Sequence, residues 1–233
     1  MFLSEFYQDH DGVIQISREQ ASDFAKSIAG DFNPIHDVDA KRFCVPGDLL
    51  FALVLNKYGI SQHMHFNFSG MVGDGVELVF PDKTDTEIVI ADVKNKPYLT
   101  IKHHGENNAS PELIDNLSRR YVEFSGQTFP HILVPLMAEH NVMVNPDRPL
   151  IIYESMTINI DQLDISNPEL NLSESKLDVQ GKRGNVCLKF SVSDKGKIVG
   201  SGEKTMVMSG LREFDQEAVD QLVKDYAIRK QAY

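Results

Sequence analysis

Two helical patterns of hydrophobic residues flank a short polar loop near the start of the chain. Ser17 to Gln20 has the form of a capping box, which predicts a helix start. Four apolar residues then recur at the spacing of one buried helix face: Ala21, Phe24, Ala25 and Ile28. Gly30 predicts the end of this helix. Residues 49–59, LLFALVLNKYG, have almost no polar face, which is typical of a helix buried on all sides.

Alternating apolar and polar positions predict strands in two groups. The first group lies at residues 63–69, 76–80, 86–93 and 98–104, and the second at 150–160, 169–179, 185–193 and 197–208. Ser110 and Pro111 open a helix between the groups, and the apolar stretch 131–140 predicts another, in which Pro135 should kink the early turns. A last helix is expected from about Asp215, because its acidic start and basic end suit the helix dipole.

The order helix, helix, strands therefore occurs twice. We interpret this as a tandem duplication in an α+β fold, with an N-terminal unit over residues 1–108 and a C-terminal unit over residues 109–233 that includes the last helix. No Gly- or Pro-rich linker separates the two units. We therefore expect them to share one continuous sheet or one interface.

Composition narrows the function classes. The chain has 233 residues, of which 42% are hydrophobic, and a formal net charge of −11, which argues against a nucleic-acid partner. Cys44 and Cys187 form neither a disulfide framework nor a metal-ligand spacing. No signal-peptide pattern and no membrane-spanning apolar run of about 20 residues is visible. We expect a cytoplasmic protein without a membrane span.

Residues 29–40 read AGDFNPIHDVDA. This stretch resembles the motif [S/A]-G-D-x-N-P-x-H of MaoC-like enzymes and (R)-specific enoyl-CoA hydratases. Five residues match it, namely Gly30, Asp31, Asn33, Pro34 and His36, and Asp39 and Ala40 fit the usual continuation. The resemblance covers about residues 17–58. It implies a double hotdog fold, in which each unit wraps a curved antiparallel sheet around a central apolar helix, and we expect a bacterial offshoot of that family.

The resemblance also implies a reaction, the hydration of a trans-2-enoyl thioester to a (3R)-hydroxyacyl thioester or the reverse dehydration. Asp31 and His36 would be the catalytic pair that holds a water between them. Asn33 would orient the loop or the water, and Gly30 and Pro34 would support the loop geometry. No cofactor or metal is implied, and the substrate is an acyl thioester of CoA or of an acyl carrier protein.

The resemblance further places the thioester oxygen at the start of the central helix, where free backbone N–H groups stabilise negative charge. Gly47 and Asp48 are the candidates for these donors. Lys41 and Arg42 are the nearest cations for the phosphates of the carrier. Two partners are possible: an acyl carrier protein, and a second copy of the chain in a homodimer.

The chain also departs from the family pattern. Pro46, Gly47 and Asp48 stand where the family usually has a His-Gly pair, and the Asp48 charge would oppose an oxyanion unless its side chain points away as a helix cap. The segment between the motif and the central helix is short, which could narrow the acyl tunnel. The second half contains no copy of the motif, so we expect at most one active site per chain.

Several alternatives stay open. Asp31 to His36 is also good turn chemistry, and Asp48 keeps a hotdog acyl-thioesterase in view, because such enzymes generally place a carboxylate within or beside the central helix. A non-catalytic acyl-thioester-binding protein is the third alternative. His63 and His65 share a strand face without an identifiable third metal ligand. Nothing near Cys44 in the sequence marks it as activated, so we expect a packed thiol.

Overall fold

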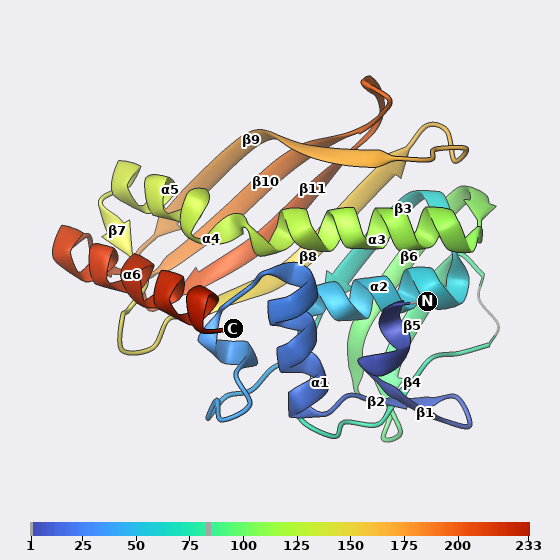
Figure 1. Ribbon diagram of the computed structural model, residues 1–233, viewed down its shortest axis with the longest axis horizontal. Helices are drawn as coiled ribbons and strands as arrows, with labels where there is room; N and C mark the ends of the chain where they lie inside the picture. The colour runs from blue at the N-terminus through green and yellow to red at the C-terminus, as the bar shows by residue number, and fades with distance from the viewer. Residues whose placement is uncertain (1, 83–84) are drawn as a thin grey trace.

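One antiparallel sheet organises the molecule, and two helices lie side by side across one of its faces (Figure 1). The computed structural model describes residues 2–82 and 85–233. Within these, ten strands form the sheet, in the order β1-β2-β4-β5-β6-β3-β8-β11-β10-β9. Its strands are β1 Gln8–His10, β2 Val13–Gln15, β3 Ile60–Phe68, β4 Leu78–Val79, β5 Glu87–Asp92, β6 Pro97–Asn108, β8 Ile151–Ile160, β9 Pro168–Gln180, β10 Arg183–Asp194 and β11 Lys197–Ser209.

The helices occupy the segments between these strands and the end of the chain. They are η1 Phe2–Glu5, α1 Arg18–Asp23, the π-helix η2 Phe24–Ala29, η3 Pro34–His36, α2 Gly47–Tyr58, α3 Pro111–Gly126, α4 Thr128–His131, α5 Leu133–Glu139 and α6 Gln216–Ala232. A separate small ladder joins β7 Val142–Met143 to β12 Arg212–Glu213. The eight strands predicted from alternation are confirmed as β3 to β6 and β8 to β11.

Strands β3 and β8 join the two halves of the chain. They pair antiparallel from His63 opposite Asn159 to Asn67 opposite Ser155. The expectation of one continuous sheet is therefore confirmed. β6 ends at Asn108 and α3 begins at Pro111, and the division into units at residues 108 and 109 stays a prediction.

Helix α2 is buried on every side because the sheet covers one face and α3 another. Every residue from Leu49 to Leu55 is buried. The Phe51 ring packs 5.1 Å from that of Phe66 in β3 and 4.5 Å from that of Tyr121 in α3. This position between two layers explains why the sequence of α2 has no polar face.

The second half differs from prediction between α3 and β7. The apolar stretch 131–140 was expected to be one helix kinked by Pro135, but α5 begins only at Leu133. The helical conformation is interrupted earlier, at Phe129, which has an extended backbone with φ −105° and ψ 135°. Pro135 lies in the first turn of α5, where an amide N–H has no helical acceptor to lose, so it causes no break.

Each half thus wraps its strands around a long helix, α2 in the N-terminal half and α3 in the C-terminal half. This arrangement is the double hotdog, an α+β fold, as predicted. The main core surrounds α2 and α3, and a second core lies between α5, α6 and the strands β9 to β11. The short elements η1, β1, β2, β7 and β12 carried no pattern that predicted them.

Candidate active site

Asp31 is presented by a left-handed turn at the end of a helix. Ser17 caps α1 in a complete capping box with Gln20, as predicted, and the helix continues as η2. Gly30 then adopts φ +64°, and the N–H of Asp31 donates to the carbonyl oxygen of Ala25 at 2.8 Å. A non-glycine residue would be strained in this conformation. The predicted helix end at Gly30 is therefore confirmed, and it fixes the direction in which the loop leaves.

The loop is held by its own side chains. Asp31 Oδ1 accepts a hydrogen bond from the N–H of Asn33 at 2.9 Å, and Asn33 Oδ1 accepts one from the N–H of Ile35 at 3.2 Å. Pro34 takes the first position of η3, for which its fixed φ is suited. The side-chain oxygen of Asn33 therefore orients the loop.

His36 is turned so that one ring nitrogen faces the Asp31 carboxylate. Its Nδ1 lies 2.6 Å from the carbonyl oxygen of Cys44, which can only accept a hydrogen bond, so Nδ1 carries the proton when the ring is neutral. Nε2 is then a free base, 3.7 Å from Asp31 Oδ2. That separation is too long for a strong direct hydrogen bond, and both atoms can accept from one water. His36 is 9% exposed and the Asp31 side chain 28%.

Beside this pair lies a cavity of about 600 Å³, lined mostly by apolar side chains from both halves of the chain. Asp31, Asn33 and His36 line it from the motif loop, and Gly47 and Asp48 from the start of α2. The structure therefore brings together the predicted catalytic pair, its supporting Asn33 and the predicted backbone donors. Lys41 and Arg42 are exposed, and neither is among the described residues that line the cavity.

The first turn of α2 approaches the aromatic wall of the cavity closely. A Cβ added to Gly47 would lie 2.7 Å from the Tyr153 ring and 3.3 Å from the Phe68 ring. Leu49 and Leu50 already donate to the carbonyl oxygen of Pro46. The N–H groups of Gly47 and Asp48 precede these and, as the first of the helix, find no acceptor within it. Because both residues line the cavity, these N–H groups are the candidates for binding an acceptor oxygen there.

The Asp48 side chain does not turn away as a cap of α2, the condition under which its charge would have been removed from the oxyanion position. Its Oδ2 accepts a hydrogen bond from the hydroxyl of Ser125, in the last turn of α3, at 2.6 Å. The same hydroxyl accepts a hydrogen bond from the ammonium group of Lys204 in β11. Burial raises the pKa of Asp48, the Lys204 charge and the Ser125 hydrogen bond oppose this rise, and the nearby Asp31 charge adds to it.

We call this buried trio the Asp48–Ser125–Lys204 cluster, and the sequence did not predict it. One signal was available for Lys204. Gly202, Lys204 and Met206 share the buried phase of β11, so a lysine stands where alternation predicts an apolar residue. Ser125 carried no comparable signal.

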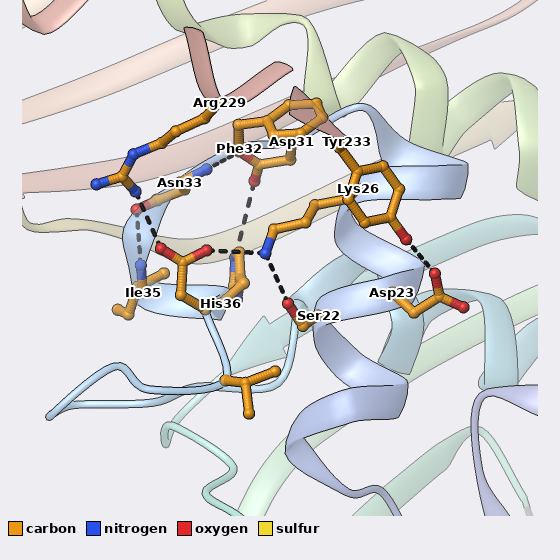
Figure 2. A network of polar contacts seen from close by, with 12 residues as sticks. Ser22, Asp23, Lys26, Asp31, Phe32, Asn33, Ile35, His36, Arg229 and Tyr233 are labelled. Carbon is orange, nitrogen blue, oxygen red and sulfur yellow. Dashed lines mark hydrogen bonds and ion pairs between the residues drawn. The ribbon is translucent and has the colours of Figure 1, made fainter. Parts of the chain in front are cut away.

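The C-terminal helix α6 closes over the motif loop. Arg229 reaches Asp37 at 2.9 Å, and Lys26 of η2 reaches the same carboxylate at 3.0 Å. Figure 2 shows these two cations approaching the loop from opposite sides. Tyr226 and Arg229 also line the cavity. Nothing in the sequence predicted that this helix contributes to the site.

The remaining candidates have other partners. His63 Nδ1 lies 2.9 Å from Asn159 Oδ1, and His65 Nδ1 lies 2.8 Å from Thr157 Oγ1, so each meets a side chain of β8. The Cys44 thiol lies 3.2 Å from the carbonyl oxygen of Val45, and burial raises its pKa to about 12. A thiol with so high a pKa is a poor nucleophile. The expectation of a packed thiol agrees with this environment.

A family model described as "Protein of unknown function (DUF3581)" matches residues 1–217. The chain belongs to the DUF3581 family. A search of curated proteins finds no match for this DUF3581 protein.

Among solved structures, the DUF3581 chain is similar to acyl-CoA thioesterase II TesB2 from Mycobacterium marinum, with 8% identity and a TM-score of 0.43 over 91% of this chain and 99% of that one. A MaoC-like dehydratase has 10% identity and a TM-score of 0.40 over 88% and 98%. The peroxisomal multifunctional enzyme type 2 from Drosophila melanogaster has 11% identity and a TM-score of 0.43 over 83% and 47%. Likenesses this distant do not distinguish one activity from another.

The described residues contain no helix that is both long and apolar enough to cross a bilayer.

Proposed function

We propose that this protein hydrates trans-2-enoyl thioesters to (3R)-hydroxyacyl thioesters, or catalyses the reverse dehydration. The observation that carries the proposal is the orientation of His36. The hydrogen bond to the Cys44 carbonyl oxygen leaves Nε2 as a base facing Asp31 on the wall of a large, mostly apolar cavity. The match to the hydratase motif at Asp31, Asn33 and His36 points to the same chemistry.

In this reaction one water would donate its two hydrogens to His36 Nε2 and Asp31 Oδ2. As its oxygen attacks C3 of the enoyl group, one proton passes to the pair, and the pair returns a proton to C2. The addition therefore needs no other proton source. The negative charge that develops on the thioester oxygen would be stabilised by the N–H groups of Gly47 and Asp48. The cavity would hold the acyl chain, carried by CoA or an acyl carrier protein.

A thioesterase is the second candidate, and it would need a carboxylate that activates water against the thioester carbonyl. Asp48 is the carboxylate at the central helix, but Ser125 occupies its Oδ2. Its Oδ1 is buried and has no hydrogen-bond partner among the described residues. Asp48 is therefore already engaged through Oδ2 and shielded at Oδ1, whereas the Asp31–His36 pair has room for a water between its two acceptor atoms. This difference favours hydration over hydrolysis.

The test offers the purified protein crotonyl-CoA and longer trans-2-enoyl-CoAs, and follows loss of the enoyl absorbance while free thiol is titrated in parallel. Asp31→Asn keeps an oxygen for the Asn33 N–H but removes the base, and His36→Ala removes the imidazole. Each should lower kcat/KM about 10²- to 10⁴-fold. Asp39→Asn makes the same change at an exposed position of the same segment and should keep wild-type activity.

The outcomes separate the candidates. Loss of absorbance in wild-type protein that disappears in both variants supports hydration. Release of free thiol would instead identify a thioesterase. If neither signal appears with any chain length, the protein is better described as one that binds acyl thioesters without turning them over.

A further inference from the structure

Three buried polar side chains meet at the inner wall of the cavity, each from a different element. Asp48 comes from the first turn of α2, Ser125 from the last turn of α3 and Lys204 from the middle of β11. All three are buried and all three line the cavity. The Ser125 hydroxyl donates to Asp48 and accepts from Lys204, so it bridges a carboxylate and an ammonium group.

Such a cluster is a costly way to join three elements. Removing a carboxylate and an ammonium group from water costs more than their attraction returns in many proteins, and apolar residues of similar size often stabilise a core better. On the buried face of β11, Lys204 stands between Gly202 and Met206. Its ammonium group lies 4.3 Å from the centroid of the Tyr153 ring. Stability therefore does not explain the cluster. Its location beside the start of α2 suggests a function instead.

The role follows from the electrostatics of the first turn of α2. That turn carries the backbone N–H groups that would face a thioester oxyanion, and it also carries the Asp48 carboxylate. An unbalanced carboxylate there would repel the oxyanion, because like charges at short range in a buried site interact strongly. The opposite charge of Lys204 and the hydrogen bond from Ser125 each lower the Asp48 pKa against the effect of burial.

We propose that Lys204 and Ser125 are positioning residues of the reaction: they balance the Asp48 charge, so that the first turn of α2 can stabilise a thioester oxyanion. This inference rests on the proposed function. It also assigns a role to the C-terminal half, which lacks the motif but supplies both residues.

The other groups around Asp48 are compatible with this role. Asp31 and His36 act on it from the motif loop, Asp31 raising and His36 lowering its pKa. Tyr121 of α3 and Tyr153 of β8 are hydrogen-bonded to each other. Burial raises the pKa of both tyrosines far above the ordinary value, so both stay neutral. Arg229, which also lines the cavity, is paired with Asp37, whereas the charge of Lys204 acts on Asp48.

The first experiment measures kcat and KM for enoyl-CoA hydration between pH 6 and 9. Lys204→Met should lower kcat about 10- to 100-fold at the alkaline end, with a smaller change in KM. The loss should shrink at acid pH, where the unbalanced Asp48 becomes protonated. Ser125→Ala should show the same pH trend with a smaller loss.

The decisive variant combines Asp48→Asn with Lys204→Met. Removal of both charges should return kcat to within about threefold of Asp48→Asn alone and abolish the extra alkaline loss of Lys204→Met, because no Asp48 carboxylate is left to balance. If the double variant is no more active than Lys204→Met, or if Lys204→Met keeps wild-type kcat at pH 9, the proposal is overturned.

Two matched controls separate this effect from general damage. Ser118→Ala changes a serine of the same helix, two turns earlier, whose buried hydroxyl has no hydrogen-bond partner among the described residues. Lys197→Met changes an exposed lysine of the same strand as Lys204. Both should keep the wild-type kcat and its pH profile, and a loss in either that matches Lys204→Met would count against a specific role.

A stability measurement keeps the inference distinct from the proposed function. In Lys204→Met the pKa of Asp48 should rise further, so the folded state holds a proton that the unfolded state releases, and Tm should fall as pH rises from 5 to 9 relative to wild type. The double variant should not show this fall. A protein without hydratase activity would overturn the proposed function, whereas a Lys204→Met variant whose Tm follows wild type at every pH would overturn the charge balance itself.

Discussion

The phenol group of Tyr226 in α6 donates a hydrogen bond to the carbonyl oxygen of Gly30, 3.0 Å away, although 196 positions separate the two residues. The Tyr226 ring also packs edge-on against Phe32 at 5.8 Å. Burial and the Asp31 charge raise the pKa of Tyr226 to about 12, so its hydroxyl remains a donor at neutral pH. The end of the chain thus holds the residue just before the candidate catalytic carboxylate.

Tyr226→Phe should lower the free energy of unfolding by about 1 kcal/mol, because it removes one hydrogen bond and keeps the ring contacts. Urea denaturation with linear extrapolation measures this difference. Ile228→Ala, on the exposed face of the same helix, should change the free energy by less than about 0.5 kcal/mol. Equal stability of Tyr226→Phe and wild type would mean that α6 does not hold the loop in solution.

Gly47→Ala should destabilise the protein by about 1–3 kcal/mol, because the added methyl group would collide with the Tyr153 ring. The same collision should displace the first turn of α2 and lower kcat of the proposed hydration. Gly73→Ala provides the control, since a Cβ at Gly73 would meet no atom within 4 Å and its φ is not positive. Thermal unfolding and enoyl-CoA assays of both variants test the prediction, which fails if the two behave alike.

Gly30→Ala should cost about 1–2 kcal/mol, and the cause is conformational rather than steric. A Cβ at Gly30 would meet nothing within 4 Å, but φ +64° disfavours alanine. Gly30→Asn should cost less than Gly30→Ala, because asparagine visits the left-handed region more readily. The urea midpoint should fall from wild type to Gly30→Asn to Gly30→Ala. A lower midpoint for Gly30→Asn than for Gly30→Ala would contradict a conformational cause.

The Cys44 thiol should resist alkylation in the folded protein. With a pKa of about 12, about one thiol in ten thousand is ionised at pH 8, and the reactive thiolate is correspondingly scarce. In a Cys187→Ser variant, iodoacetamide at pH 8 should label the native protein very slowly and the urea-unfolded protein within minutes, as read by intact mass. Rapid labelling of the native protein would show that Cys44 is accessible and activated.

The sequence predicted those parts of the fold that depend on local patterns. Alternation located the strands of the main sheet, and the capping box at Ser17 and the glycine at position 30 defined the first helix. The motif loop was also local, because Asp31 and His36 lie five positions apart and one short segment determines how they approach.

The rest depends on contacts between distant segments. Ser125 and Lys204 are 77 and 156 positions from Asp48, and only the packing of α2, α3 and β11 brings them together. The docking of α6 on Gly30 has the same origin. The prediction for 131–140 failed only at Pro135, which was expected to kink the helix but lies in its first turn. The interruption lies before the stretch, at Phe129, whose extended backbone is typical of a residue that precedes a proline.

Because β3 pairs with β8, each half of the chain relies on the other to cover one edge of its part of the sheet. A chain cut between Asn108 and Pro111 would leave each fragment with a row of unsatisfied amides and carbonyls along one strand. Two such fragments produced together carry complementary edges in a fixed register. The protein is for that reason a natural starting point for a split reporter, in which reassembly of the site depends on the meeting of two separately made pieces.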